Sequence, residues 1–102
     1  MSELALSSLS PSIRQGIGCP ITLSFTCPKC GPPYTINIPI TLNGINPRPD
    51  IRSWNFICPD PPDFAWDKVT VTPSIDNSPG GHGRKKPCSF HGNITSGKVT
   101  FP

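Results

Sequence analysis

Residues 27–40 read CPKCGPPYTINIPI, a turn with two cysteines that runs directly into an alternating strand. The apolar positions of the strand alternate with Thr, Asn and Pro, and they are Tyr34, Ile36, Ile38 and Ile40. Because successive side chains of a strand point to opposite faces, this pattern predicts one apolar row against a core and one polar row outward. The stretch therefore predicts a β-strand anchored to a cysteine turn.

The rest of the chain also consists of short β-favouring segments separated by turn residues. Only 34% of the 102 residues are hydrophobic, and 15 prolines and 9 glycines interrupt the chain too often for long helices. The predicted strands are Ile21 to Thr26, Tyr34 to Ile40, Arg52 to Ile57, Lys68 to Ile75, Phe90 to Thr95 and Lys98 to Phe101. The pattern predicts a small all-β fold, an antiparallel β-sandwich or partly open barrel of about six short strands.

Domain organisation follows from length and from a change of composition near residue 18. One core is expected for a chain of this length. Residues 1–18 contain Ser-rich patches, two glycines and only a weak helical spacing, so they are predicted to form a flexible N-terminal arm. Residues 19–102 are predicted to form a single β domain.

Charge and hydropathy exclude several classes of protein. The first ten residues, MSELALSSLS, lack the positive and apolar regions of a secretory signal peptide, and no stretch approaches the length of a membrane span. We therefore expect an intracellular protein in a reducing compartment, where thiols bind metal rather than form disulfides. A net charge of +3 is too small to indicate nucleic-acid binding by itself.

The two cysteines of residues 27–31, CPKCG, are spaced to bind one metal ion. Thiolates separated by two residues reach the same tetrahedral ion from one turn, and Gly31 lets the backbone turn its amides toward the sulfurs. A redox pair is the alternative, but Pro32 and Pro33 prevent the helix that would lower the pKa of Cys27. The sequence thus predicts half of a zinc site.

The other half must come from Cys58, Cys88, His82 or His91. Cys88 and His91 repeat the separation by two residues, so they are the favoured pair. The hypothesis is one structural Zn²⁺ per chain, held by Cys27, Cys30, Cys88 and His91. Cys58 is the possible alternative ligand.

Residues 26–101 resemble a small zinc-binding domain of unknown function that is common in phage genomes, some members of which carry the misleading label of ammonia monooxygenase. The matching pieces are a CxxC turn, a strand with a tryptophan, a TxxPSI strand, a CxxH element and a GxVxF strand. In this chain they are Cys27 to Cys30, Trp54, residues 69–75 (VTVTPSI), Cys88 to His91 and residues 94–101.

The resemblance implies metal binding by Cys27, Cys30, Cys88 and His91, and a viral protein located in the host cytoplasm or the virion. It supplies no reaction. Four thiolate and imidazole ligands would also close the coordination of the ion, which is typical of a structural and not a catalytic site. We therefore expect a non-enzymatic phage accessory protein.

Two surface features suggest binding partners. Phe64 and Trp66 form a possible aromatic patch for a protein partner, because aromatic side chains are frequent interface anchors. Residues 78–87, SPGGHGRKKP, place Arg84, Lys85 and Lys86 in a Gly-rich loop that offers a possible contact to a partner. A protein partner is the favoured interpretation, and a small zinc-ribbon-like module associated with nucleic acid through the basic loop is the alternative.

Overall fold

A computed structural model describes residues 2–77, 81–82 and 87–102 of the chain. Arg84, Lys85 and Lys86 of the basic loop lie outside the described residues. The strands, in chain order, are β1 (Ser2–Ala5), β2 (Ser12–Arg14), β3 (Thr22–Thr26), β4 (Thr35–Leu42), β5 (Trp54–Ile57), β6 (Thr70–Asp76), β7 (His91–Thr95) and β8 (Lys98–Phe101). Two short 3₁₀ helices, η1 (Leu6–Leu9) and η2 (Trp66–Lys68), complete the described elements, and neither is long enough to cross a membrane.

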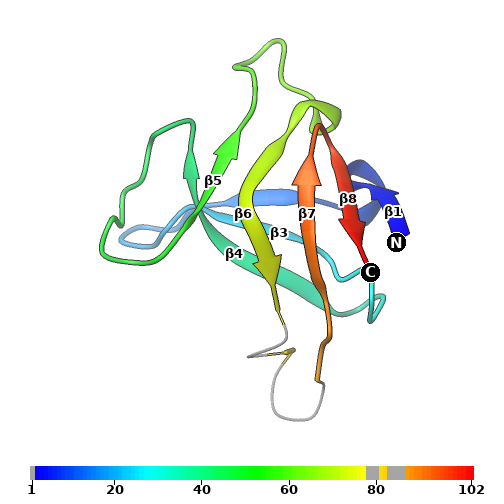
Figure 1. The fold of residues 1–102 in the computed structure, drawn as a ribbon. Helices are drawn as coiled ribbons and strands as arrows, with labels where there is room; N and C mark the ends of the chain where they lie inside the picture. Colours follow the sequence, from blue (N-terminus) through cyan, green and yellow to red (C-terminus); the bar gives the residue numbers. More distant parts are fainter. Residues whose placement is uncertain (1, 78–80, 83–86) are drawn as a thin grey trace.

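All eight strands belong to one sheet in the order β1-β8-β7-β6-β5-β4-β3-β2, which curls on itself (Figure 1). Neighbouring strands are antiparallel except for the parallel pair β4–β5. The six strands predicted from periodicity correspond to β3 through β8. The small all-β fold is thus confirmed, with two additional strands and a curled single sheet.

The curl follows from the positions of β1 and β2. These strands are consecutive in sequence but lie at opposite edges of the sheet. Eight strands spaced about 4.8 Å apart would separate the edges of a flat sheet by roughly 34 Å. Residues 6–11, which connect the two strands, span at most about 25 Å even when fully extended. The connection is only possible because the sheet bends and brings its edges toward each other.

The structure places residues 2–14 in the fold, as β1, η1 and β2, where the sequence predicted a flexible arm over residues 1–18. β1 pairs with β8 along its whole length, and β2 pairs with β3. In η1, Leu6 and Leu9 are 0% and 8% exposed, because their side chains enter the core. Burial of two leucines against the inside of the curl stabilises the segment by about 1.5–3 kcal/mol each.

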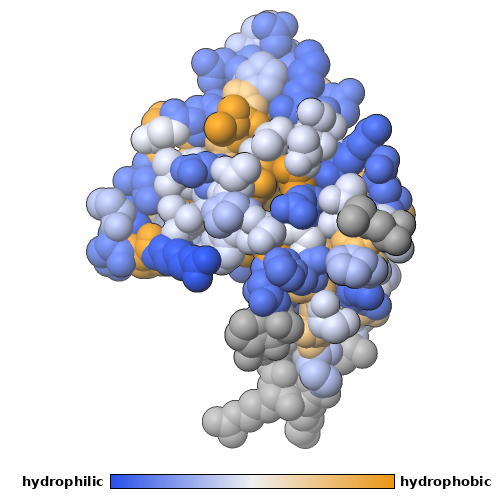
Figure 2. Space-filling model, viewed as in Figure 1, coloured by the Kyte–Doolittle hydropathy of each residue, from blue (hydrophilic) through white to orange (hydrophobic). Residues whose placement is uncertain are grey.

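The core fills the inside of the curl. In β4, Ile36, Ile38 and Ile40 are buried while Thr35 and Asn37 are exposed, as the alternation predicted. The largest fully buried side chains are Phe25, Phe56, Phe90, Leu6, Leu23, Ile36, Ile40, Ile75 and Ile94. On the face drawn in Figure 2, hydrophobic residues show only in small patches among hydrophilic ones.

A hairpin connects β7 and β8. Ser96 and Gly97 both have positive φ, 48° and 75°, which matches the right-handed twist of the flanking strands. A Cβ on Gly97 would lie 2.2 Å from the Cα of Asp67, so only glycine fits this turn. Leu6 N–H donates to Gly97 O at 2.8 Å, which attaches η1 to the hairpin.

Candidate metal centre

The two-cysteine turn begins where β3 ends. Cys27 N–H donates to Tyr34 O at 2.9 Å, so the turn continues the pairing of β3 with β4. Within it, Gly31 N–H donates to Cys27 O at 2.9 Å, and Gly31 has φ of 73°. Gly31 thus has the left-handed conformation that the sequence required, and the loop presents Cys27 and Cys30 on one side.

Cys88 reaches the same place from the segment that leads into β7. Burial alternates along this extended segment, with Cys88 and Phe90 buried and Ser89 and His91 exposed. Cys88 Sγ lies 3.6 Å from Cys27 Sγ and accepts a hydrogen bond from Phe90 N–H at 3.4 Å. The strand period therefore points Cys88 inward, toward the turn.

His82 is the fourth member, and hydrogen bonds between its neighbour Gly81 and Asn77, which follows β6, position it. Gly81 N–H donates to Asn77 O at 2.8 Å, and the Asn77 side-chain amide donates to Gly81 O at 3.4 Å. The His82 ring packs against the Tyr34 ring, with centroids 5.3 Å apart and planes tilted by 33°. Since Tyr34 lies at the base of the cysteine turn, this ring contact places the His82 side chain beside the thiols.

The ligand atoms of Cys27, Cys30, His82 and Cys88 all lie within 4.8 Å of one another. A tetrahedral zinc ion with Zn–S distances of about 2.3 Å separates two sulfurs by about 3.8 Å, close to the 3.6 Å between Cys27 and Cys88. His82 Nε2 is buried and has no hydrogen-bond partner among the described residues. A buried nitrogen without a partner is costly, and a metal ion at this position would satisfy it.

The surroundings of the two buried thiols shift their pKa values in opposite directions. Burial raises the pKa of Cys27 to about 11, although the backbone amides of Cys30 and Lys29 partly oppose this. Burial also disfavours the thiolate of Cys88, but hydrogen bonds, above all from the Asn77 side chain and then from Phe90 N–H, outweigh it and lower the pKa of Cys88. The amide hydrogen bonds are of the kind that support metal-bound thiolates.

His91, the predicted fourth ligand, lies outside this cluster. It is exposed on β7, and its Nε2 is 3.1 Å from Ser74 Oγ. The physical reason is the strand period: residues three apart in an extended chain point to opposite faces, so Cys88 and His91 diverge. The structure replaces His91 by His82, a residue that the sequence analysis had considered but not favoured.

Cys58, the alternative ligand, also lies elsewhere. Its N–H donates to the side-chain oxygen of Asn43 at 3.0 Å, and its carbonyl accepts from the Asn43 amide at 2.9 Å. Burial is the main cause of a raised pKa for the Cys58 thiol. Cys19 is exposed and is likewise absent from the cluster.

The predicted aromatic patch is half-buried and packs against the core. The rings of Phe64 and Trp66 make an edge-to-face contact with centroids 5.2 Å apart, and Trp66 makes a second one with Phe56 at 6.3 Å. Phe64 lines an apolar cavity, together with Ile13 and Leu42. These aromatic residues thus support the fold, and one of them borders a cavity.

No family model matches this chain, and no curated protein or solved structure matches it either. The resemblance to the phage-borne domain stays a prediction.

Proposed function

We propose that this chain is a non-enzymatic module built around one structural zinc ion, and that it acts by binding another protein. The ligands in this proposal are Cys27, Cys30, His82 and Cys88. The observation that carries it is the cluster of four possible ligands, two of them buried, in which His82 Nε2 has no hydrogen-bond partner among the described residues and two sulfurs have the spacing of a tetrahedral site. The phage origin suggested by the resemblance is a separate expectation.

Zinc is the ion that best suits this set of donors. Three thiols and one imidazole form a combination typical of structural zinc sites, whereas magnesium and calcium prefer oxygen ligands. Four protein ligands complete a tetrahedral coordination and leave no position for a water molecule or substrate. The chemistry supplied by the ion is therefore cross-linking and not catalysis.

The cross-link joins segments that are distant in sequence. Cys27 and Cys30 follow β3, His82 follows β6, and Cys88 precedes β7. A structural zinc site in a small domain contributes apparent free energies of about 10–16 kcal/mol at pH 7. In a chain with a modest apolar content, that contribution is comparable with the whole stability of a typical domain.

The test is metal content and its effect on the fold. Protein purified without chelator should contain one zinc ion per chain, and cobalt substitution should give the visible absorption of a tetrahedral thiolate site. Removal of the metal should lower the melting temperature and reduce the β-sheet signal in circular dichroism. Cys19→Ser is the matched control, since Cys19 is exposed and outside the cluster. Absence of metal, or an unchanged melting curve after its complete removal, would contradict the proposal.

A further inference from the structure

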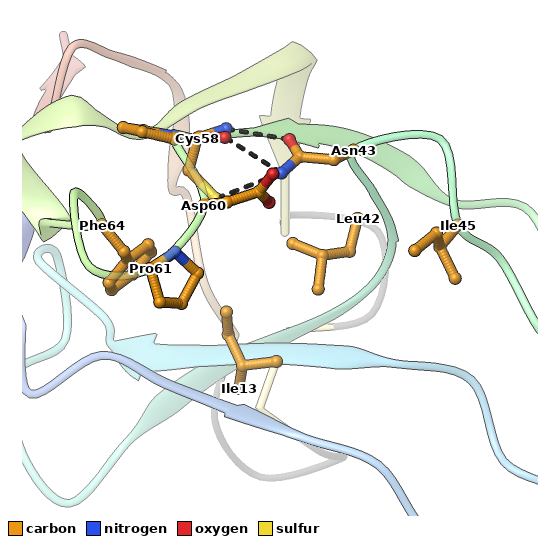
Figure 3. Close-up of a pocket in the computed structure, with 9 residues that line it drawn as sticks. Ile13, Leu42, Asn43, Ile45, Cys58, Asp60, Pro61 and Phe64 are labelled. Carbon is orange, nitrogen blue, oxygen red and sulfur yellow. Dashed lines mark hydrogen bonds between the residues drawn. The ribbon is translucent and has the colours of Figure 1, made fainter.

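An apolar cavity of about 300 Å³ lies next to the edge strand β2 (Figure 3). Ile13 of β2 points into it from one side, Leu42 and Ile45 border it on another, and Pro61 and Phe64 on a third. Ile45 is 65% exposed at the rim, which is unusual for a large aliphatic side chain. The volume is at the lower limit of ligand-binding pockets and suits one or two apolar side chains.

Two polar side chains border the cavity: Asn43, which is hydrogen-bonded to Cys58, and Asp60, whose residue is exposed. The Asn43 side chain makes hydrogen bonds to both the N–H and the carbonyl of Cys58, as Figure 3 shows. This pairing holds the loop after β5 against the end of β4. The cavity wall is otherwise apolar, and it selects for an apolar group.

The direction of the main-chain groups in β3 follows from one hydrogen bond. Ile40 N–H donates to Ile21 O at 2.8 Å, so the backbone of Ile21 faces β4. In an antiparallel pair, the main-chain groups of successive residues point alternately to the two sides of the strand. Leu23 consequently also faces β4, whereas Thr22 and Ser24 face β2.

The same alternation defines the free side of β2. Arg14 is opposite Thr22 and Ser12 is opposite Ser24, so the main-chain groups of Arg14 and Ser12 pair with β3. Ile13 lies between them, and its N–H and carbonyl point away from β3. Since β2 is the last strand of the sheet among the described residues, these two groups face the open edge. Such an edge is a template for one further strand.

Arg14 adds a charge to this edge. It is exposed, on the face of β2 opposite to Ile13, and its guanidinium donates a hydrogen bond to Ser24 Oγ at 3.2 Å. Within the described part of the chain it makes no ion pair. A cation beside an open edge favours a partner with a negative charge at the neighbouring position.

We propose that the β2 edge binds an extended, acidic peptide segment of a partner protein. Its main chain pairs with the N–H and carbonyl of Ile13, one apolar side chain enters the cavity, and an adjacent carboxylate contacts Arg14. This combination of edge pairing for affinity and pocket filling for specificity is a recurrent mode of peptide recognition. The inference rests on the protein-binding part of the proposed function and names the class of partner.

An extended peptide accounts for the three observations together. A small apolar molecule would fill the cavity but leave the main chain of Ile13 unpaired and Arg14 unused. A second copy of this chain would satisfy the edge, but Arg14 of each copy would then meet no acidic residue of β2, whose sequence is Ser-Ile-Arg. Both alternatives are distinguishable outcomes of the experiment.

The experiment selects binders from a displayed library of random short peptides, using immobilised zinc-loaded protein. The expected result is enrichment of peptides with an aliphatic or aromatic residue next to Asp or Glu. The Arg14→Glu variant should weaken the wild-type binders by about fivefold, from the loss and reversal of one surface charge pair. The Arg14→Glu variant should also select peptides that have a basic residue in place of the acidic one. Arg52→Glu, which makes the same change of charge at an exposed site elsewhere, is the matched control.

Two further measurements distinguish the contribution of the cavity to peptide affinity from that of the main-chain pairing. Ile45→Arg should weaken the selected peptide by about tenfold, whereas Ile57→Arg, an equally exposed isoleucine on β5, should not. Methylation of the peptide nitrogen that faces the Ile13 carbonyl removes one hydrogen bond and should cost roughly tenfold. This last arm changes only the ligand, so it cannot fail through misfolding of the protein.

The proposal is overturned if no peptide is enriched above the Ile45→Arg variant, or if the enriched peptides show no preference for acid. Binding that tolerates peptide methylation would assign the cavity to a side chain or small molecule alone. A dimer in analytical ultracentrifugation that is lost in Ile45→Arg would assign the edge to a second copy. Zinc content measured in the same samples separates these failures from a failure of the metal centre.

Discussion

Replacement of each histidine, one at a time, by alanine is the most direct test of the candidate metal centre. His82 and His91 are the only histidines of the chain, and the structure gives them opposite roles. A ring nitrogen of His82 lies within 4.8 Å of the three thiol sulfurs, and its Nε2 is buried, whereas His91 is exposed and contacts Ser74 Oγ at 3.1 Å. The CxxH spacing predicts that His91→Ala loses zinc affinity, whereas the position of His82 in the cluster predicts that His82→Ala does.

The expected magnitudes differ by more than an order of magnitude. If about 10–16 kcal/mol of zinc-binding free energy is shared among four ligands, His82 contributes about 3 kcal/mol. His82→Ala should then raise the dissociation constant for zinc by about 100-fold, since each 1.4 kcal/mol corresponds to about tenfold. His91→Ala removes one exposed hydrogen bond, worth within about 0.5 kcal/mol, so it should change zinc affinity by less than about threefold.

The assay is a competition titration with a chromophoric zinc chelator at fixed pH. His82→Cys serves as a rescue, because a fourth thiolate also completes a tetrahedral zinc site. Circular dichroism of the zinc-saturated variants confirms that each is folded. A larger loss of affinity in His91→Ala than in His82→Ala would refute the ligand assignment, and losses below about threefold in both variants would show that neither histidine binds the ion.

Three other predictions concern thiols, a turn and a loop. Among the five cysteines, only Cys19 and Cys58 should react with a maleimide in zinc-loaded protein, and all should react after chelation and unfolding, as mass spectrometry would show. Because burial raises the pKa of Cys58, its thiolate fraction is small near neutral pH. Cys58 should therefore react with maleimide more slowly than a cysteine in an unstructured peptide. The difference between the two reaction rates should become smaller as pH rises. Gly97→Ala should cost at least about 2 kcal/mol in urea unfolding, because its Cβ would collide with Asp67, while Gly44→Ala, where the site is open, should cost less; equal costs would contradict this account of the turn. Asn43→Ala should lower stability by about 1 kcal/mol through the loss of its hydrogen bonds to Cys58, with zinc content unchanged; loss of zinc in this variant would show that the loop and the metal centre are coupled.

Local periodicity was sufficient to predict most of the sheet. Over residues 35–40 of β4 and along β7, buried residues alternate with exposed or half-buried ones, because one face of each strand packs on the core. The positive φ at Gly31 and Gly97 was equally predictable, since in each case glycine stands where the chain must reverse. These features depend on neighbours within a few residues, so the sequence contains all the information they need.

β1 and β2 could not be found in this way. Every residue of β1 is exposed, so it has no apolar row and is held by main-chain pairing with β8. Which strand a segment pairs with depends on the closure of the whole sheet, and only the structure shows that the two edges are close. The buried Leu6 and Leu9 were the only local sign that the N-terminal segment belongs to the core.

The candidate metal centre likewise combines residues that local sequence predicts with one that only the tertiary structure places. The first two candidate ligands could be predicted from local sequence, because the turn that places Cys27 beside Cys30 is complete within residues 27–34. The fourth candidate ligand depends on tertiary structure: hydrogen bonds to Asn77 hold Gly81, and the ring of Tyr34 packs against the ring of His82. Cys88 and His91 share the spacing of the first pair, but a strand turns residues three apart to opposite faces, and a turn does not.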